Sequence, residues 1–390
     1  MPLPYEPWGR HCPEIRFMRK GTREMKKLNL ALSLLMGGTA LVFASSSVPK
    51  DLQSAGKDAL KLLSGSLSSS DSRVRSQVAR AWGIIGNPAA VSILKQALLD
   101  QEDSVRVYAA YSLFQLKSLI GVPVLKSIIR QSSQNVSDSS PVAELRRIAH
   151  DKMRVLAIRK LFEIEGKKSE SLLRSLLDDS SGEVRDAAAA GLARMGLPDF
   201  EAEFSSALDS PDVSVRVAAV KDLGNIRTGA ALKELTRAAS DPAVEVREET
   251  MRVLPQFPAL RSAPLLTAAL KDSDPRVRAQ ALAGLALLSD AESIPALKKI
   301  SEDSLNSDTR LEAEAGLARR GQKINLDLAE RVLNASDPDL KTLALNVLGA
   351  DLSLRSDRLL AEVMKSNADL RLRIEAATFL LEHLAGRKAS

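Results

Sequence analysis

The chain has 390 residues, of which 45% are hydrophobic and only 3% aromatic, so a large core built from aliphatic side chains is expected. Its formal net charge of +6 suggests nucleic-acid binding at first sight. Residues 1–44, however, contain seven basic and three acidic side chains and carry a net charge of +4. The remaining +2 is too small for the basic surface that nucleic acids require. The composition therefore argues against nucleic acid as a partner.

The segment 25–44 has the layout of a bacterial secretory signal. A short basic start at Met25 precedes an apolar run over residues 28–43, and small residues surround Ala44 and Ser45. We expect cleavage between Ala44 and Ser45, a linker over residues 45–50, and a periplasmic or secreted protein. The alternative is an uncleaved inner-membrane anchor formed by residues 28–43.

Residues 1–24 show neither amphipathic order nor any relation to the rest of the chain. We expect Met25 to be the true start and residues 1–24 to be a non-native upstream extension. The alternative is that they form a long basic leader. The sole cysteine, Cys12, lies in this stretch, so cleavage of the signal would leave no thiol, which suits an oxidising compartment.

One short phrase recurs through the rest of the chain, most clearly as Asp-Pro-Arg-Val-Arg at residues 274–278. Its last basic residue returns every 30–32 residues, apart from one step of 48. The members of this column are Arg75, Arg106, Arg154, Arg185, Arg216, Arg247, Arg278, Arg310, Lys341 and Arg371. A period this regular is typical of a repeat array.

After the phrase, apolar residues follow helical spacing, as at Val277, Ala281, Leu285 and Leu288. Asp274 occupies the position expected of an N-cap, with proline in the first turn. A second amphipathic helix precedes each phrase, so each unit is a helical hairpin that must stack on its neighbours. The pattern predicts an all-α, right-handed α-solenoid of about ten hairpins over residues 51–390.

The phrase and its period resemble the HEAT-repeat family, in the short bacterial form that also occurs in phycobilin-lyase-type proteins. The resemblance implies an internal ladder between acidic and basic turn residues of successive repeats. The ladder would combine the basic column above with Asp71, Asp212, Asp274 and Asp337. It also implies bilin-lyase activity as a possible function, which no residue pattern supports independently.

Two positions depart from the repeat pattern. Trp82 replaces the usual leucine at a core position and is expected to be buried. The last repeat carries Arg371, Arg373 and Glu375, and its polar residues suggest a cap that ends the array.

The second repeat is the best candidate for a contact surface. Tyr108, Tyr111 and Phe114 form a stripe off the core face, where other repeats carry small or charged residues. The alternative is that these rings cover a neighbouring helix. An insertion at about residues 131–147 follows, and if its end is helical it would bring Arg146 and Arg147 near the tyrosines.

No catalytic constellation, glycine-rich phosphate loop or His/Cys metal pattern is present in the sequence, so we expect no cofactor and no metal. We interpret the chain as an exported, non-catalytic scaffold for protein–protein interaction. It would act as a monomer that binds no nucleic acid, and no membrane after cleavage. The alternatives are a bilin-lyase-like enzyme or enzyme subunit, and a cytoplasmic adaptor.

Overall fold

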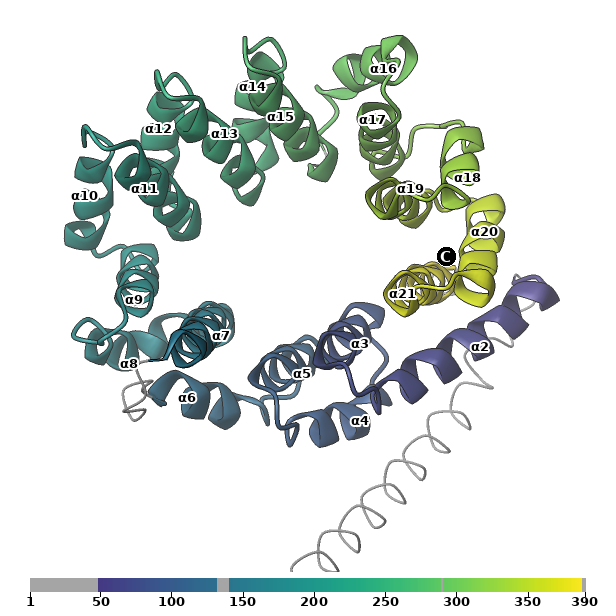
Figure 1. The fold of residues 1–390 in the computed structure, drawn as a ribbon, viewed down its shortest axis with the longest axis horizontal. Helices are drawn as coiled ribbons and strands as arrows, with labels where there is room; N and C mark the ends of the chain where they lie inside the picture. The colour runs from purple at the N-terminus through teal and green to yellow at the C-terminus, as the bar shows by residue number, and fades with distance from the viewer. Residues whose placement is uncertain (1–47, 132–139, 289, 388–390) are drawn as a thin grey trace, which may run out of the picture.

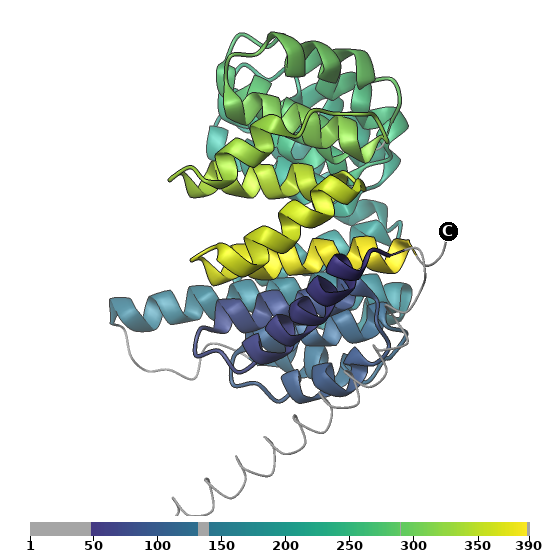
Figure 2. The same ribbon diagram turned by 90° about the vertical axis from the view of Figure 1, so that its right-hand side faces the viewer.

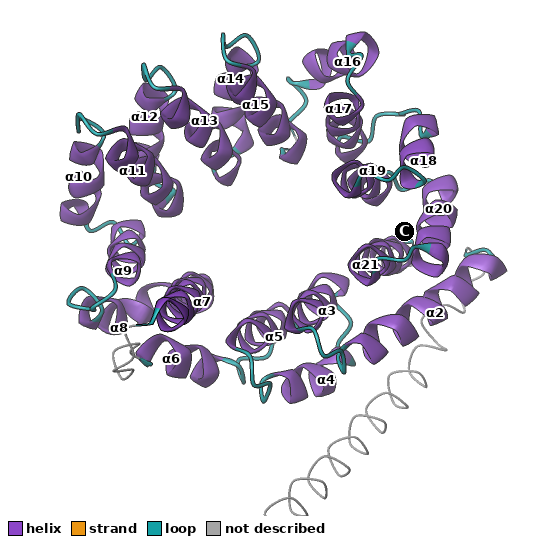
Figure 3. Cartoon of the chain, viewed as in Figure 1, coloured by secondary structure: helices purple, strands orange, loops and turns teal. Residues whose placement is uncertain are grey.

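The computed structural model describes residues 48–131, 140–288 and 290–387, and these consist of α-helices joined by short turns, with no strand (Figures 1 and 3). The predicted signal, its cleavage site at Ala44 and Ser45, and the upstream extension lie outside the described residues. Within the described ranges, no helix is both long enough and apolar enough to cross a membrane. The all-α solenoid class is confirmed, whereas the number of repeats and the handedness stay predictions.

The helices alternate between two layers (Figure 1). The outer layer comprises α2 (Lys50–Ser66), α4 (Ala90–Ala97), α6 (Val122–Arg130), α8 (Glu170–Ser175), α10 (Pro198–Ala207), α12 (Gly229–Ala238), α14 (Ala259–Ala269), α16 (Ile294–Asp303), α18 (Asp327–Leu333) and α20 (Leu354–Ser366). The inner layer comprises α3 (Ser72–Ile85), α5 (Asp103–Gln115), α7 (Pro141–Glu165), α9 (Gly182–Arg194), α11 (Val213–Ile226), α13 (Val244–Val253), α15 (Pro275–Leu287), α17 (Ser307–Arg319), α19 (Pro338–Ala350) and α21 (Leu370–Gly386). Two 3₁₀ turns, η2 (Gly166–Ser169) and η3 (Leu254–Gln256), complete the regular structure.

The turn phrase acts as a helix start. The Asp274 carboxylate accepts a hydrogen bond of 2.8 Å from the backbone N–H of Arg276, and α15 begins at Pro275, whose missing N–H costs nothing there. Val277, Ala281 and Leu285 are fully buried on the face toward the core. Each phrase therefore sets the direction of an inner helix and turns its apolar stripe outward onto the outer layer.

Trp82 is fully buried, as expected from the sequence. Pro255 lies in η3, directly after α13 ends at Val253, because proline cannot continue an α-helix without loss of a backbone hydrogen bond. The end of the insertion is helical, because α7 begins at Pro141 with the Ser140 hydroxyl as its N-cap.

The array closes on itself, which the sequence analysis did not anticipate. Each inner helix contacts the next from α3 to α21, and α21 in turn contacts α3. Outside this cycle, α2 packs against α20 and α21. Figure 2 shows the C-terminal helices in yellow lying against the N-terminal helices in purple. The described helices thus form a ring (Figure 1).

The predicted polar cap at the last repeat was wrong. Leu372, Ile374 and Leu380 of α21 are buried in the same hydrophobic cluster as Leu52 and Leu60 of α2. Because the first and last repeats cover each other's apolar faces, neither end needs a polar cap.

The ladder exists, but its acidic members were assigned wrongly. Asp71, Asp212, Asp274 and Asp337 bind the backbone N–H groups of their own helices as N-caps. The rungs among the described residues instead join an arginine to the aspartate 25 positions later. They are Arg75–Asp100, Arg154–Asp179, Arg216–Asp241 and Arg247–Asp272.

The run from Arg216 to Arg278 shows how the rungs link successive repeats. Arg247 binds the Asp272 carboxylate with distances of 2.8 and 3.0 Å, and its Nη1 donates to the backbone carbonyl of Asp241 at 2.9 Å. Asp241 is itself paired with Arg216 through distances of 2.9 and 3.0 Å. Hydrogen bonds from Arg247 hold the pKa of Asp272 below its ordinary value.

The other members of the basic column make no such rung. A rung needs a carboxylate 25 positions after the basic residue. The chain has instead Gln131 after Arg106, Ser210 after Arg185, Ala335 after Arg310 and Ser366 after Lys341. Arg106 pairs with Asp103, Arg371 with Asp369 and Arg310 with Glu314, each on its own helix or cap. Arg278 binds the carbonyls of Asp272 and Ser273. The predicted ladder is therefore real but interrupted.

Candidate functional site: the inner surface of the ring

The aromatic stripe lies on the inner helix α5, and its central ring is already in contact with the next inner helix. Lys160 of α7 places its Nζ 3.9 Å from the centre of the Tyr111 ring, and the Phe114 ring centre lies 6.1 Å from that of Tyr111. Burial and a hydrogen bond with Glu163 raise the pKa of the Tyr111 hydroxyl to about 12. Tyr108 is half-buried against the core. These contacts are those expected if the stripe covers a neighbouring helix.

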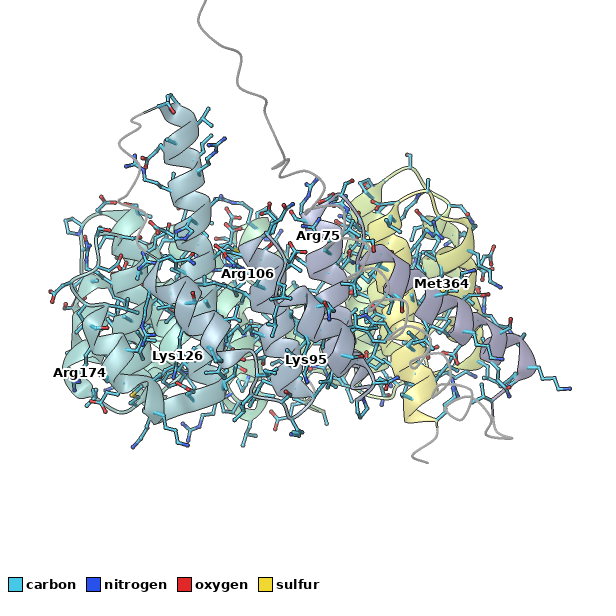
Figure 4. The ribbon with its side chains drawn as sticks, turned by 90° about the horizontal axis from the view of Figure 1, so that it is seen from below. Arg75, Lys95, Arg106, Lys126, Arg174 and Met364 are labelled. Carbon is cyan, nitrogen blue, oxygen red and sulfur yellow. The ribbon has the colours of Figure 1, made fainter. Side chains whose placement is uncertain are left out.

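Arg146 and Arg147 do not lie near the tyrosines, so that prediction was wrong. Both belong to the first turns of α7, which project beyond the edge of the ring marked by Arg75 and Arg106 (Figure 4). At ~1.5 Å per residue, about 20 Å of helix separates Arg147 from Lys160. Arg147 pairs instead with Glu144 on its own helix. The insertion lengthens α7 along its axis, which carries the arginines away from α5.

The inner surface has instead a basic pocket that the sequence analysis missed. It is a cavity of about 460 Å³ bordered by four successive inner helices, α7, α9, α11 and α13, and by the segment after each of the last two. Its cationic side chains are Arg159, Lys160, Arg194, Lys221, Arg227 and Arg252, against one lining carboxylate, Glu163. We call this the basic pocket.

Only part of this positive charge is neutralised. Lys160 lies 3.3 Å from Glu163, and Arg252 pairs with Glu249. Among the described residues, Arg159, Arg194, Lys221 and Arg227 form no ion pair within 4.0 Å. These last four cations are therefore available to an anion that enters the ring.

Crowding of the cations affects the pKa values of Arg159 and Arg194. The pKa of Arg159 is lowered by desolvation, with repulsion from Arg227 and Arg252 adding to the effect and attraction by Asp222 opposing it. The pKa of Arg194 is lowered by desolvation and by the Arg227 charge. Although Arg159 is open to solvent, the concave wall around it limits its hydration. An anion placed among these side chains would relieve the repulsion.

Side-chain packing fixes the position of some of these cations. The Arg194 guanidinium lies 4.5 Å from the centre of the Phe162 ring, and Arg227 Nε donates to Gln256 Oε1 at 3.2 Å. Arg227 ends α11 in a left-handed conformation, with φ of 58°. That turn moves its side chain off the helix and toward η3, so two of the four unpaired cations are held in place.

A signal for the pocket was present in the sequence. Arg159, Lys221 and Arg252 occupy the same helical position in their repeats as Tyr111, five residues after the ladder arginine or its equivalent. Although α9 carries Ala190 at this position, the charge of the position across neighbouring repeats, rather than its aromatic exceptions, would have indicated the pocket. Arg194 and Arg227 lie one turn or more further on, where only the packing of the helices brings them in.

Within the described ranges, no group of three His, Cys, Asp or Glu side chains is placed to hold a metal ion. His383 is buried with Asp357, and its second ring nitrogen lies 2.9 Å from the Gly349 carbonyl. Both nitrogens are therefore engaged inside the last repeat.

Comparisons with known proteins bear on the fold. The family model of HEAT repeats matches residues 50–114 and 238–318. No curated protein matches the chain. Among solved structures, human deoxyhypusine hydroxylase in complex with glycerol is 18% identical, with a TM-score of 0.31, and the match covers 70% of this chain and 99% of that chain.

Two other solved structures are similar to this chain. The complex of CpcE and CpcF of phycocyanin lyase from Nostoc sp. PCC7120 is 22% identical with a TM-score of 0.35, covering 65% of this chain and 94% of that chain. An engineered protein is 18% identical with a TM-score of 0.33, covering 84% of this chain and 98% of that chain. The family match shows that two separate stretches of this chain consist of HEAT repeats.

Proposed function

We propose that the chain is a non-catalytic binding protein that holds a segment of a partner protein on the inner surface of its ring. The observation that carries this proposal is the basic pocket, where four cations without ion-pair partners face a shared cavity. HEAT-type solenoids use extended concave surfaces for binding, and closure of the ring makes this concave surface continuous.

We propose further that the protein acts outside the cytoplasm. The support is the sequence of residues 25–44, whose basic start, apolar run and small residues before Ser45 are typical of a secretory signal. Cell fractionation with mass spectrometry of the mature N-terminus tests this point. A mature chain that begins at Ser45 is expected, and a cytoplasmic protein that retains residues 28–43 would contradict it.

Site-specific photo-crosslinking tests the binding proposal. A photoreactive amino acid at Gln256, which lines the basic pocket, is compared in the source cells with one at Lys95 on the outer helix α4. We expect a discrete protein adduct from position 256 and none of the same size from position 95. Adducts only from the outer position would overturn the proposal that the partner enters the ring.

A further inference from the structure

The charge balance of the basic pocket indicates the chemistry of the partner. Four cations from three helices line one cavity. They are Arg159 of α7, Arg194 of α9, Lys221 of α11 and Arg227, which directly follows α11. Packing like charges together is unfavourable unless something offsets it. Glu163, the one carboxylate of the lining, is paired with Lys160, and Asp222, which attracts Arg159 and Lys221, is not part of the lining.

We propose that the basic pocket binds an acidic segment of the partner protein, with its Asp or Glu carboxylates held by Arg159, Arg194, Lys221 and Arg227. This inference rests on the proposed function and specifies the partner for the same surface. Guanidinium groups donate two parallel hydrogen bonds to a carboxylate, and such charge-assisted bonds are the strong ones. Lys221 is exposed and adds a flexible point charge to the lining of the cavity.

The walls of the pocket suit a peptide segment. Leu156 is half-buried and adds apolar surface to the lining, which can cover the aliphatic part of an acidic side chain. The volume of about 460 Å³ is that of a ligand-sized cavity rather than a single-ion site. Several side chains of an extended segment therefore fit, while the rest of the segment follows the inner surface.

The distribution of charge argues against a polynucleotide as the occupant. Such a partner needs cations along a continuous track. The helical position of Arg159, Lys221 and Arg252 is not basic in every repeat, because it carries Ala190 in α9, Ala283 in α15 and Ala315 in α17. The cations at this position therefore form no continuous track around the ring, whereas the group in the basic pocket is sufficient for a short acidic segment.

Fluorescence anisotropy with labelled hexaglutamate tests the inference on the full-length protein. We expect saturable binding that weakens as salt is added, because the contacts are ionic. The double variant Arg159→Gln/Lys221→Gln should weaken this binding about tenfold. Neither side chain forms an ion pair among the described residues, and both are exposed, so the fold should be retained.

The matched control is Lys95→Gln/Lys298→Gln, which removes the same net charge from the outer helices α4 and α16. It should bind hexaglutamate as the wild-type protein does. Equal losses in both double variants would mean that only net charge matters and would overturn the inference. Tighter binding of tripolyphosphate than of hexaglutamate, lost in the pocket variant, would also overturn it in favour of a phosphate site.

The outcome separates this inference from the proposed function. If position 256 still crosslinks to a partner while hexaglutamate does not bind, the acidic-segment inference fails and the binding proposal stands. If hexaglutamate binds to the pocket but no partner is crosslinked from inside the ring, the proposed function fails.

Discussion

Arg358 of α20 and Asp51 of α2 form an ion pair of 3.1 Å although 307 positions separate them in the chain. Lys365 and Asp58 repeat this relationship two turns along, at 3.9 Å. All four side chains are more than half exposed, so each pair contributes only ~0–1 kcal/mol. The stability of the seam must come mainly from the apolar side chains beneath these pairs.

Leu60→Ala tests the packing of the seam. Leu60 is 1% exposed on α2, which packs against α3, α20 and α21, so its truncation should lower the free energy of unfolding by about 2–5 kcal/mol. Hydrogen exchange should speed up in α21 as well as in α2. Asp51→Asn is the control and should change stability by less than ~1 kcal/mol. Unchanged exchange in α21 would contradict tight packing of the two ends.

Ser210→Asp should add a missing rung to the ladder. Ser210 lies 25 positions after Arg185, where a rung would have its aspartate. Its hydroxyl accepts a hydrogen bond of 3.2 Å from the backbone N–H of Asp212. The rung aspartates Asp179 and Asp241 likewise accept from the backbone N–H two residues later. Arg185 is exposed and forms no ion pair among the described residues. Chemical denaturation should show stabilisation of up to ~1 kcal/mol, and Ser210→Asn should not reproduce it. Destabilisation would show that Arg185 cannot reach this position.

His383 predicts a pH-dependent contribution to stability. Its ring nitrogens lie 2.8 Å from Asp357 Oδ1 and 2.9 Å from the Gly349 carbonyl oxygen, and because both partners are acceptors, both nitrogens must donate. Burial lowers the pKa of His383, but the hydrogen bonds to Asp357 and Gly349 outweigh it and raise the pKa. A raised pKa stabilises the fold below the ordinary value of about 6.5 and loses this effect as pH rises through the raised value.

The measurement for His383 is the difference in unfolding free energy between the wild type and His383→Gln across pH. We expect a difference of about 1.5–3 kcal/mol near pH 6 that shrinks as the pH rises. Burial raises the pKa values of Glu312 and Glu314 to about 7, so these residues also make stability depend on pH. Their contribution is the same in the wild type and the variant and cancels in the difference of the two unfolding free energies. A difference that is constant with pH would contradict a charged His383.

Asp222 predicts how the basic pocket responds to pH. Burial and repulsion from Asp186 of α9 raise the pKa of Asp222 to about 6. Attraction by Arg159 and Lys221 and a hydrogen bond from Asn225 oppose this rise. Protonation of Asp222 as the pH falls from 7.5 to about 5.5 removes one negative charge beside the cations. Glutamate side chains in the probe, with an ordinary pKa of about 4.3, stay ionised over most of this range.

Hexaglutamate binding should therefore strengthen several-fold as the pH is lowered through about 6. Asp222→Asn should bind more tightly at neutral pH and lose most of the pH dependence. Binding that weakens on acidification in the wild-type protein, or an unchanged profile in Asp222→Asn, would contradict this role.

The repeat unit could be predicted from the sequence because its signals are local. The Asp274 cap, the apolar spacing after Val277 and the position of Pro255 each act within one or two turns of helix. The ladder was predicted only in outline. An N-cap and a rung aspartate stand two residues apart, as Asp274 and Asp272 do, and only the packing of the next repeat distinguishes their partners.

Closure of the ring and the basic pocket depend on the geometry of the whole array. Small rotations between successive repeats accumulate before α21 meets α3, and no local pattern encodes their sum. The same accumulation brings Arg159 and Arg252, which belong to separate repeats, to one cavity. Arg147 likewise lies far from Tyr111 because α7 is 25 residues long and Arg147 lies near its start.

Crosslinking across the seam tests the closed ring most directly. Asp58→Cys and Lys365→Cys are combined in a Cys12→Ser background and treated with a short bis-maleimide, with Asp58→Cys/Lys271→Cys as the control pair across the ring. The account predicts rapid intramolecular crosslinking of the first pair, since the wild-type side chains lie 3.9 Å apart, and none of the second. Equal failure of both pairs would show that the ends are apart in solution and would contradict the ring.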